Sequence, residues 1–162
     1  MKHLQRYIKL ICEQEQLPLP FPEEQESEEE RSKREAEESK MLEKENLVKA
    51  FMETPSHGIH LAKMLKHEIA EDFHEIKENV LFLIELVEDK SHLMPHGGYN
   101  YPAQDGINRT GQHIIDDLIH VGIGDENEIF QLVKSVYMGC TNNAKSPYCI
   151  ENTEALKEWV NL

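Results

Sequence analysis

The chain has 162 residues, of which 39% are apolar and only 7% aromatic. That composition fills one modest core and disfavours a large β-sheet. With 31 acidic residues against 17 basic ones, the formal charge of −14 argues against direct binding to nucleic-acid phosphates and favours a basic protein or a metal cation as partner. No apolar run approaches the ~20 residues of a membrane span, so we expect no membrane contact.

The N-terminal residues 1–22 predict a short amphipathic helix followed by a proline linker. They lack the uninterrupted apolar run of a signal peptide, so we expect a cytoplasmic protein. There the three cysteines, Cys12, Cys140 and Cys149, are expected to be reduced thiols. Cys140 and Cys149 are close enough in sequence to pair if the protein were exported.

Residues 23–54 are expected to form one segment, of which 23–46 are rich in glutamate and hold too few apolar side chains for a core, while the chain becomes amphipathic from Leu42 through Leu47, Val48 and Phe51. Glutamate and basic residues three and four positions apart, with no Gly or Pro among them, favour an acidic helical arm over disorder. Thr54 and Pro55 end it.

Residues 56–162 are expected to form a helical core domain. Apolar residues at a period near 3.6 predict one long central helix over about 59–89. The Gly- and Pro-rich stretch 91–107 predicts an irregular connection. Shorter helices follow, with predicted N-caps at Asn108 or Thr110, at Asp125, and at Asn152 or Thr153. The fold class is therefore all-α, an irregular bundle of five or six helices.

Two ordered pairs of a carboxylate and an imidazole are the first candidate site. Glu71 with His74, and Asp117 with His120, each have the spacing that puts both side chains on one helix face. Glu-x-x-His pairs on facing helices build di-iron and di-manganese sites, and the same ligands suit zinc. The alternative is a solvated ladder of histidines and glutamates that binds no cofactor.

The stretch 91–107 supplies the second candidate site. Tyr99 and Tyr101, with His96 and Asp105 nearby, form a predicted partner-binding group, because tyrosine offers a large contact area at low entropic cost. The alternative is that the tyrosines fold back over the bundle.

The run from Pro95 to Gly122, with Tyr101-Pro102 followed by Ile114 and Leu118, resembles the tyrosine-containing segment and last helix of the DNase-colicin immunity proteins. The resemblance covers about a sixth of the chain and implies an acidic helical inhibitor of a basic nuclease. Of the acids which that family clusters around its tyrosines, only Asp105 is present.

No nucleophile elbow, P-loop, dinucleotide fingerprint or HExxH motif occurs, so we lean towards a protein without enzymatic activity. We expect a module that binds a basic protein, of the inhibitor, immunity or anti-defence type. The alternative is a metal-binding bundle with oxidoreductase or hydrolase activity that uses Fe, Mn or Zn. The sequence leaves open whether the chain forms a homodimer.

Overall fold

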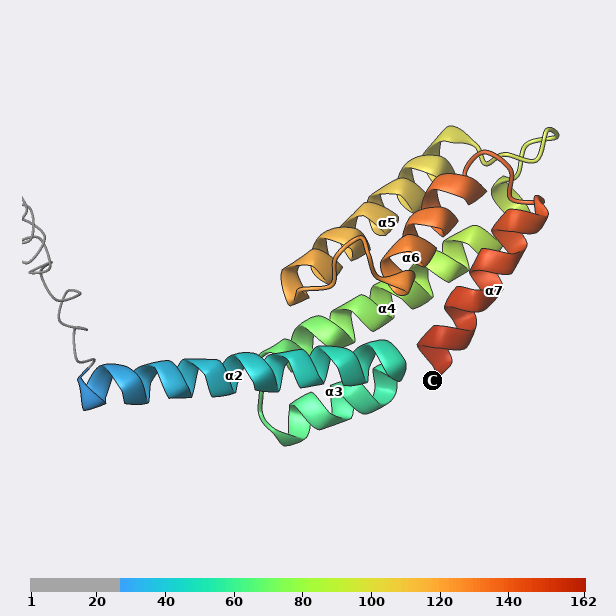
Figure 1. Ribbon diagram of the computed structural model, residues 1–162. Coiled ribbons are helices and arrows are strands. Elements are labelled where there is room, and N and C mark those ends of the chain that lie inside the picture. The colour runs from blue at the N-terminus through green and yellow to red at the C-terminus, as the bar shows by residue number, and fades with distance from the viewer. Residues whose placement is uncertain (1–26) are drawn as a thin grey trace, which may run out of the picture. The chain divides into compact units, whose positions relative to one another are not determined.

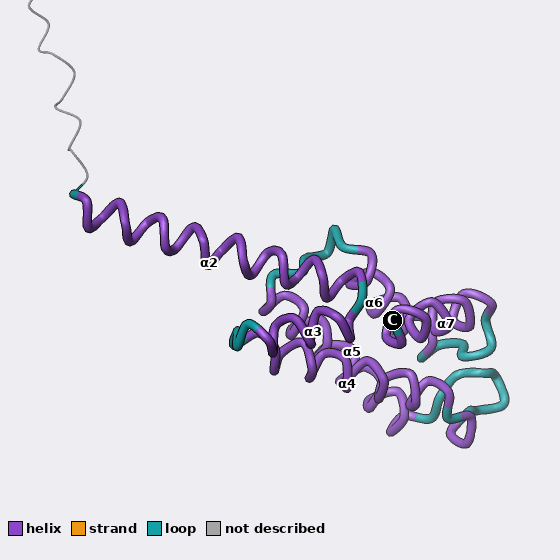
Figure 2. The backbone as a smooth tube through the Cα atoms, turned by 90° about the horizontal axis from the view of Figure 1, so that it is seen from below, coloured by secondary structure: helices purple, strands orange, loops and turns teal. Residues whose placement is uncertain are grey.

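The computed structural model describes residues 27–162, and this range consists of helices joined by turns and loops (Figures 1 and 2). The elements are α2 (Glu28–Glu53), α3 (Pro55–Met64), α4 (Ile69–Glu88), the 3-10 turn η1 (Lys90–His92), α5 (Tyr101–Val121), α6 (Glu128–Cys140) and α7 (Pro147–Asn161). The only β-type pairing within this range is an isolated antiparallel bridge between Leu93 and Tyr99. The predicted all-α bundle is confirmed. Every helix within residues 27–162 is too short or too polar to cross a lipid bilayer.

The chain divides into two compact units, residues 1–40 and 41–162. The described part of the first unit opens with a capping box. Ser27 donates its amide N–H to Glu30 Oε2 at 3.0 Å, and the Glu30 amide N–H donates to Ser27 Oγ at 3.2 Å. The exposed first half of α2 therefore has a defined start. The predicted helix and linker at 1–22 lie outside the described residues, as does Cys12, and the proposed domain boundaries stay predictions.

Helix α4 is the centre of the second unit, because α3, α5, α6 and α7 all pack against it (Figure 1). Its buried positions recur at helical spacing, from Ile69 and Phe73 to Val87. The Phe73 ring stacks on Phe51 of α2 with centroids 4.2 Å apart, and the Trp159 ring meets Phe51 edge-on at 5.7 Å. This aromatic cluster ties the end of α2 and the end of α7 to the central helix.

The single helix predicted over about 59–89 is instead two helices, α3 and α4. Lys66 adopts a left-handed conformation with φ 53°, and its N–H donates to the Lys63 carbonyl while the His67 N–H donates to the Ala62 carbonyl. These two bonds cap the end of α3. Glycine is the usual residue in a left-handed helix cap. Because lysine stands at this position, the sequence does not reveal that α3 ends here. The His67 ring then accepts the Ile69 amide N–H at 3.2 Å, at the start of α4.

Helices α5 and α7 begin earlier than predicted, at Tyr101 and Pro147. The irregular connection expected over 91–107 is therefore wrong beyond Asn100, whose side chain caps α5. Ser146 caps α7 in the same way. Pro102 and Pro147 stand in the first turn of their helices, where the missing amide N–H costs nothing.

Cys140 at the end of α6 and Cys149 near the start of α7 form a disulfide, with Cα atoms 5.0 Å apart. The prediction of reduced thiols is wrong for this pair, because the tight turn between the two helices brings the cysteines together. Both are buried. Cytoplasmic localisation stays a prediction, and the disulfide counts against it, since cytosolic thiols are normally kept reduced.

Candidate functional site

Tyr99 lies in the core, with 2% of its surface exposed. Its hydroxyl donates to the Val87 carbonyl of α4, and its amide N–H donates to the Thr141 carbonyl at 3.5 Å. Burial, and after it the charges of Asp89 and Glu88, raise the pKa of Tyr99 to about 12. The predicted role of Tyr99 as a surface anchor is wrong, because its ring closes the turn before α5 onto the central helix.

The rest of the predicted partner-binding group stays on the surface. Tyr101 opens α5 and is 81% exposed. Asp105, one turn later, pairs with Arg109 at 2.9 Å. His96 is exposed, and its ring lies close over Gly98 within the preceding turn. Tyr101 therefore keeps the exposure of a binding anchor, whereas Asp105 and His96 are engaged locally.

The four predicted metal ligands do not meet at one point. Asp117 lies beside other residues, His113 and Glu75, and His120 lines a separate hollow. Glu71 and His74 of α4 are exposed, and neither belongs to the one group of ligand-type side chains that converges within residues 27–162. Which side chains of α4 meet those of α5 depends on how the two helices align. The spacing of residues within each helix does not determine that alignment.

Several ionisable side chains of α4 and α5 lie near one another. We call this group the acidic strip, and it consists of Asp72, Glu75, His113, Asp116, Asp117 and His120. His113 bridges the two helices: its Nε2 lies 3.7 Å from Glu75 Oε1 and its Nδ1 lies 3.6 Å from Asp117 Oδ1. Within residues 41–162, no Lys or Arg forms an ion pair with any carboxylate of the strip. The carboxylates of the strip therefore have no Lys or Arg of this range within ion-pair distance, although Lys44 approaches Asp72 in the hollow described below.

Asp117 is the least exposed carboxylate of the bridge, with 23% of its side chain accessible. Burial is the main reason that its pKa is raised, while the neighbouring His113 lowers the pKa. Its Oδ2 is buried without a hydrogen-bond partner, and so is Asn79 Nδ2. The Asn79 amide is close enough to favour the carboxylate, although no hydrogen bond of normal geometry joins the two. A partly buried carboxyl group whose pKa is raised by its surroundings is a candidate functional residue.

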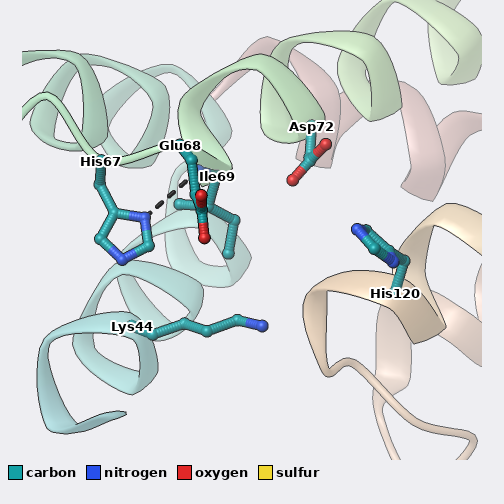
Figure 3. A pocket seen from close by; sticks show the side chains of 6 residues that line it. All are labelled: Lys44, His67, Glu68, Ile69, Asp72 and His120. Atoms are coloured by element: carbon teal, nitrogen blue, oxygen red, sulfur yellow. Dashed lines mark hydrogen bonds between the residues drawn. The ribbon is translucent and has the colours of Figure 1, made fainter. Parts of the chain in front are cut away.

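One end of the acidic strip opens into a hollow, shown in Figure 3. Asp72 of α4 and His120 of α5 point towards each other across it, and the Lys44 side chain reaches towards both from α2. His67 and Glu68 complete the polar wall. The hollow therefore combines carboxylates and imidazoles with one ammonium group.

A second and more apolar hollow adjoins the first, because Lys44 lines both. Its apolar wall comes from α2, where Met41, Val48 and Met52 contribute, and Gly122 closes it after the end of α5. Met41 is 63% exposed. An apolar depression beside a charged border is a common arrangement at protein interfaces.

Sequence reasoning found Asp117 and His120 but missed Asp72 and Glu75 as their neighbours. Asp72 and Glu75 lie three positions apart beside the buried stripe of α4. Their place next to that stripe was the only feature of the sequence that could have indicated them. Comparison with known proteins adds no relative: no family model, curated protein or solved structure matches the chain.

Proposed function

We propose that this chain is a binding module that engages a basic partner protein through the acidic strip and the adjoining apolar hollow. The observation that carries the proposal is the set of four carboxylates on α4 and α5 that form no ion pair with any Lys or Arg of residues 41–162. Basic side chains of a partner would supply the missing charge, and the charge of the whole chain would accelerate association.

The apolar hollow supports a protein partner over a small cation. Protein interfaces combine an apolar centre with a polar rim, and the residues that contribute most to affinity fill pockets near the centre. A partner side chain seated against Met41 and Met52 would lie beside the hollow of Asp72 and His120. Tyr101 is exposed at the other end of α5 and would add a further contact for the same partner. Inhibitors and immunity proteins are modules of this type.

The test compares two triple variants that lose the same charge. Asp72→Asn with Glu75→Gln and Asp116→Asn neutralises the strip. A matched control, with Glu85→Gln, Glu151→Gln and Glu158→Gln, neutralises exposed acids elsewhere in residues 41–162.

Each immobilised protein is incubated with native lysate at low salt in a chelating buffer, and the partner recovered by the wild type is quantified. Three lost surface pairs at about 0.5 kcal/mol each weaken binding roughly tenfold. We expect that loss for the strip variant and near-normal recovery for the control. Equal recovery by both variants, or no basic partner at all, would contradict the proposal.

A further inference from the structure

We propose that Glu75, His113 and Asp117 bind one divalent first-row transition metal ion, of which Zn²⁺ is the best example. This inference goes beyond the binding of a basic partner and does not depend on it. The ligand set differs from the one that the sequence suggested, and only Asp117 is common to both.

The geometry comes from two helices that are already packed together. His113 and Asp117 stand one turn apart on α5, so their side chains share a face, and Glu75 approaches the same point from α4. One ligand atom from each residue lies within 4.8 Å of the others. Glu75 and Asp117 face different nitrogens of the His113 ring, so side-chain rotations about this fixed backbone have to bring two oxygens and one ring nitrogen to bonding distance from a common ion.

Two buried atoms beside these ligands lack a hydrogen-bond partner of normal geometry. Asp117 Oδ2 and Asn79 Nδ2 are an acceptor and a donor, and native proteins rarely leave such atoms unsatisfied. When Asp117 Oδ1 binds a cation, the carboxylate becomes fixed, and Oδ2 is left to accept from the Asn79 amide. Asn79 then acts as a positioning residue for the ligand, in the way that outer groups orient metal-binding carboxylates.

The donor set selects the class of ion. Mg²⁺ and Ca²⁺ prefer oxygen ligands alone, whereas an imidazole together with carboxylates suits Zn²⁺ and its neighbours in the first row. Three protein ligands leave at least one position open. The side chains of His113 and Glu75 are 54% and 62% exposed, so an ion reaches the site directly from solvent.

The experiment uses the full chain, purified without a polyhistidine tag and stripped with chelator. Zn²⁺ is titrated at pH 7 by calorimetry, while imidazole resonances are followed by ¹⁵N NMR. We expect one ion per chain and a shift of the His113 ring signals. His113→Gln and Asp117→Asn should each weaken binding at least about tenfold, and Asn79→Ala should weaken it roughly tenfold. Lowering the pH should weaken binding, because protons compete with the metal for the imidazole and carboxylate ligands.

His74→Gln is the matched control, since it removes an exposed imidazole of α4 that lies outside the converging group. It should leave Zn²⁺ binding unchanged. Circular dichroism of each variant confirms that the helices remain. Binding that survives His113→Gln, depends on His74 or His120 instead, or is equally strong for Mg²⁺ would overturn the proposal, as would a stoichiometry well below one. The pull-down in chelator is unaffected by any of these results, so the two proposals fail separately.

Discussion

Replacing Gly58 with alanine tests a close backbone contact between α3 and α2. A Cβ on Gly58 of α3 would lie 2.3 Å from Phe51 Cα and 2.5 Å from its amide nitrogen. These are backbone atoms of α2, so no side chain can rotate away. Phe51 is also fully buried and stacked on Phe73. The methyl group therefore forces α2 and α3 apart and disturbs the aromatic cluster.

The magnitude follows from two opposing terms. Alanine gains about 1 kcal/mol over glycine from helix propensity, while overpacking of a rigid contact costs about 3 kcal/mol, the upper end of the usual range. We expect Gly58→Ala to lower the free energy of unfolding by about 2 kcal/mol. Gly106→Ala is the matched control, because Gly106 is inside α5 and no atom lies within 4 Å of its added Cβ. That change should raise stability by about 1 kcal/mol.

Urea unfolding followed by circular dichroism at 222 nm measures both variants. The expected difference of about 3 kcal/mol corresponds to roughly 6 to 12 °C in Tm for a chain of this size. If Gly58→Ala is as stable as Gly106→Ala, the close approach of α3 to Phe51 is refuted.

Three further changes test other parts of the fold. Lys66→Gly should raise stability by about 1 kcal/mol in urea titrations, because glycine adopts the left-handed conformation without strain; a loss would contradict this cap. Replacing Cys140 and Cys149 with alanine should cost about 2 to 3 kcal/mol by the loop-closure estimate for a sequence separation of 9, and reductant should have the same effect on the wild type alone. Tyr99→Phe should lose about 1 kcal/mol with its bond to the Val87 carbonyl. The pKa of Tyr99 is raised in the folded protein, so the hydroxyl's contribution to stability is present below pH 10 and lost as the pH rises towards 12. Tyrosinate absorbance should show one tyrosine that titrates later than the others, and this late titration should be absent from Tyr99→Phe.

Hydrophobic periodicity was sufficient to predict the fold class, because the buried faces of α4, α5 and α6 recur at helical spacing. Helix ends were harder to predict. Lys66 ends α3 without the glycine that usually marks such a cap, and Pro102 and Pro147 resemble breakers although they stand in first turns. Lys66 adopts a conformation that its residue type disfavours, whereas proline is compatible with both the start and the end of a helix.

The candidate site was only half predictable for a related reason. The spacing of His113, Asp117 and His120 along α5 reveals a polar face, but it does not say which residues of α4 meet that face. The choice of Glu75 over Glu71 depends on the alignment of two helices. Tyr99 was misplaced because a tyrosine in a Gly- and Pro-rich stretch is equally compatible with an exposed anchor and a buried plug.

Histidine labelling with diethyl pyrocarbonate tests most directly whether the acidic strip is the binding surface. The chain carries suitable probes, since His113 and His120 are exposed within the strip and His57 and His60 are exposed on α3. Labelling is compared, by peptide mass spectrometry, between the free chain and its complex with the recovered basic partner. We predict that the partner protects His113 and His120 while His57 and His60 stay reactive. Protection of the α3 histidines, with His113 and His120 labelled as in the free chain, would contradict the account.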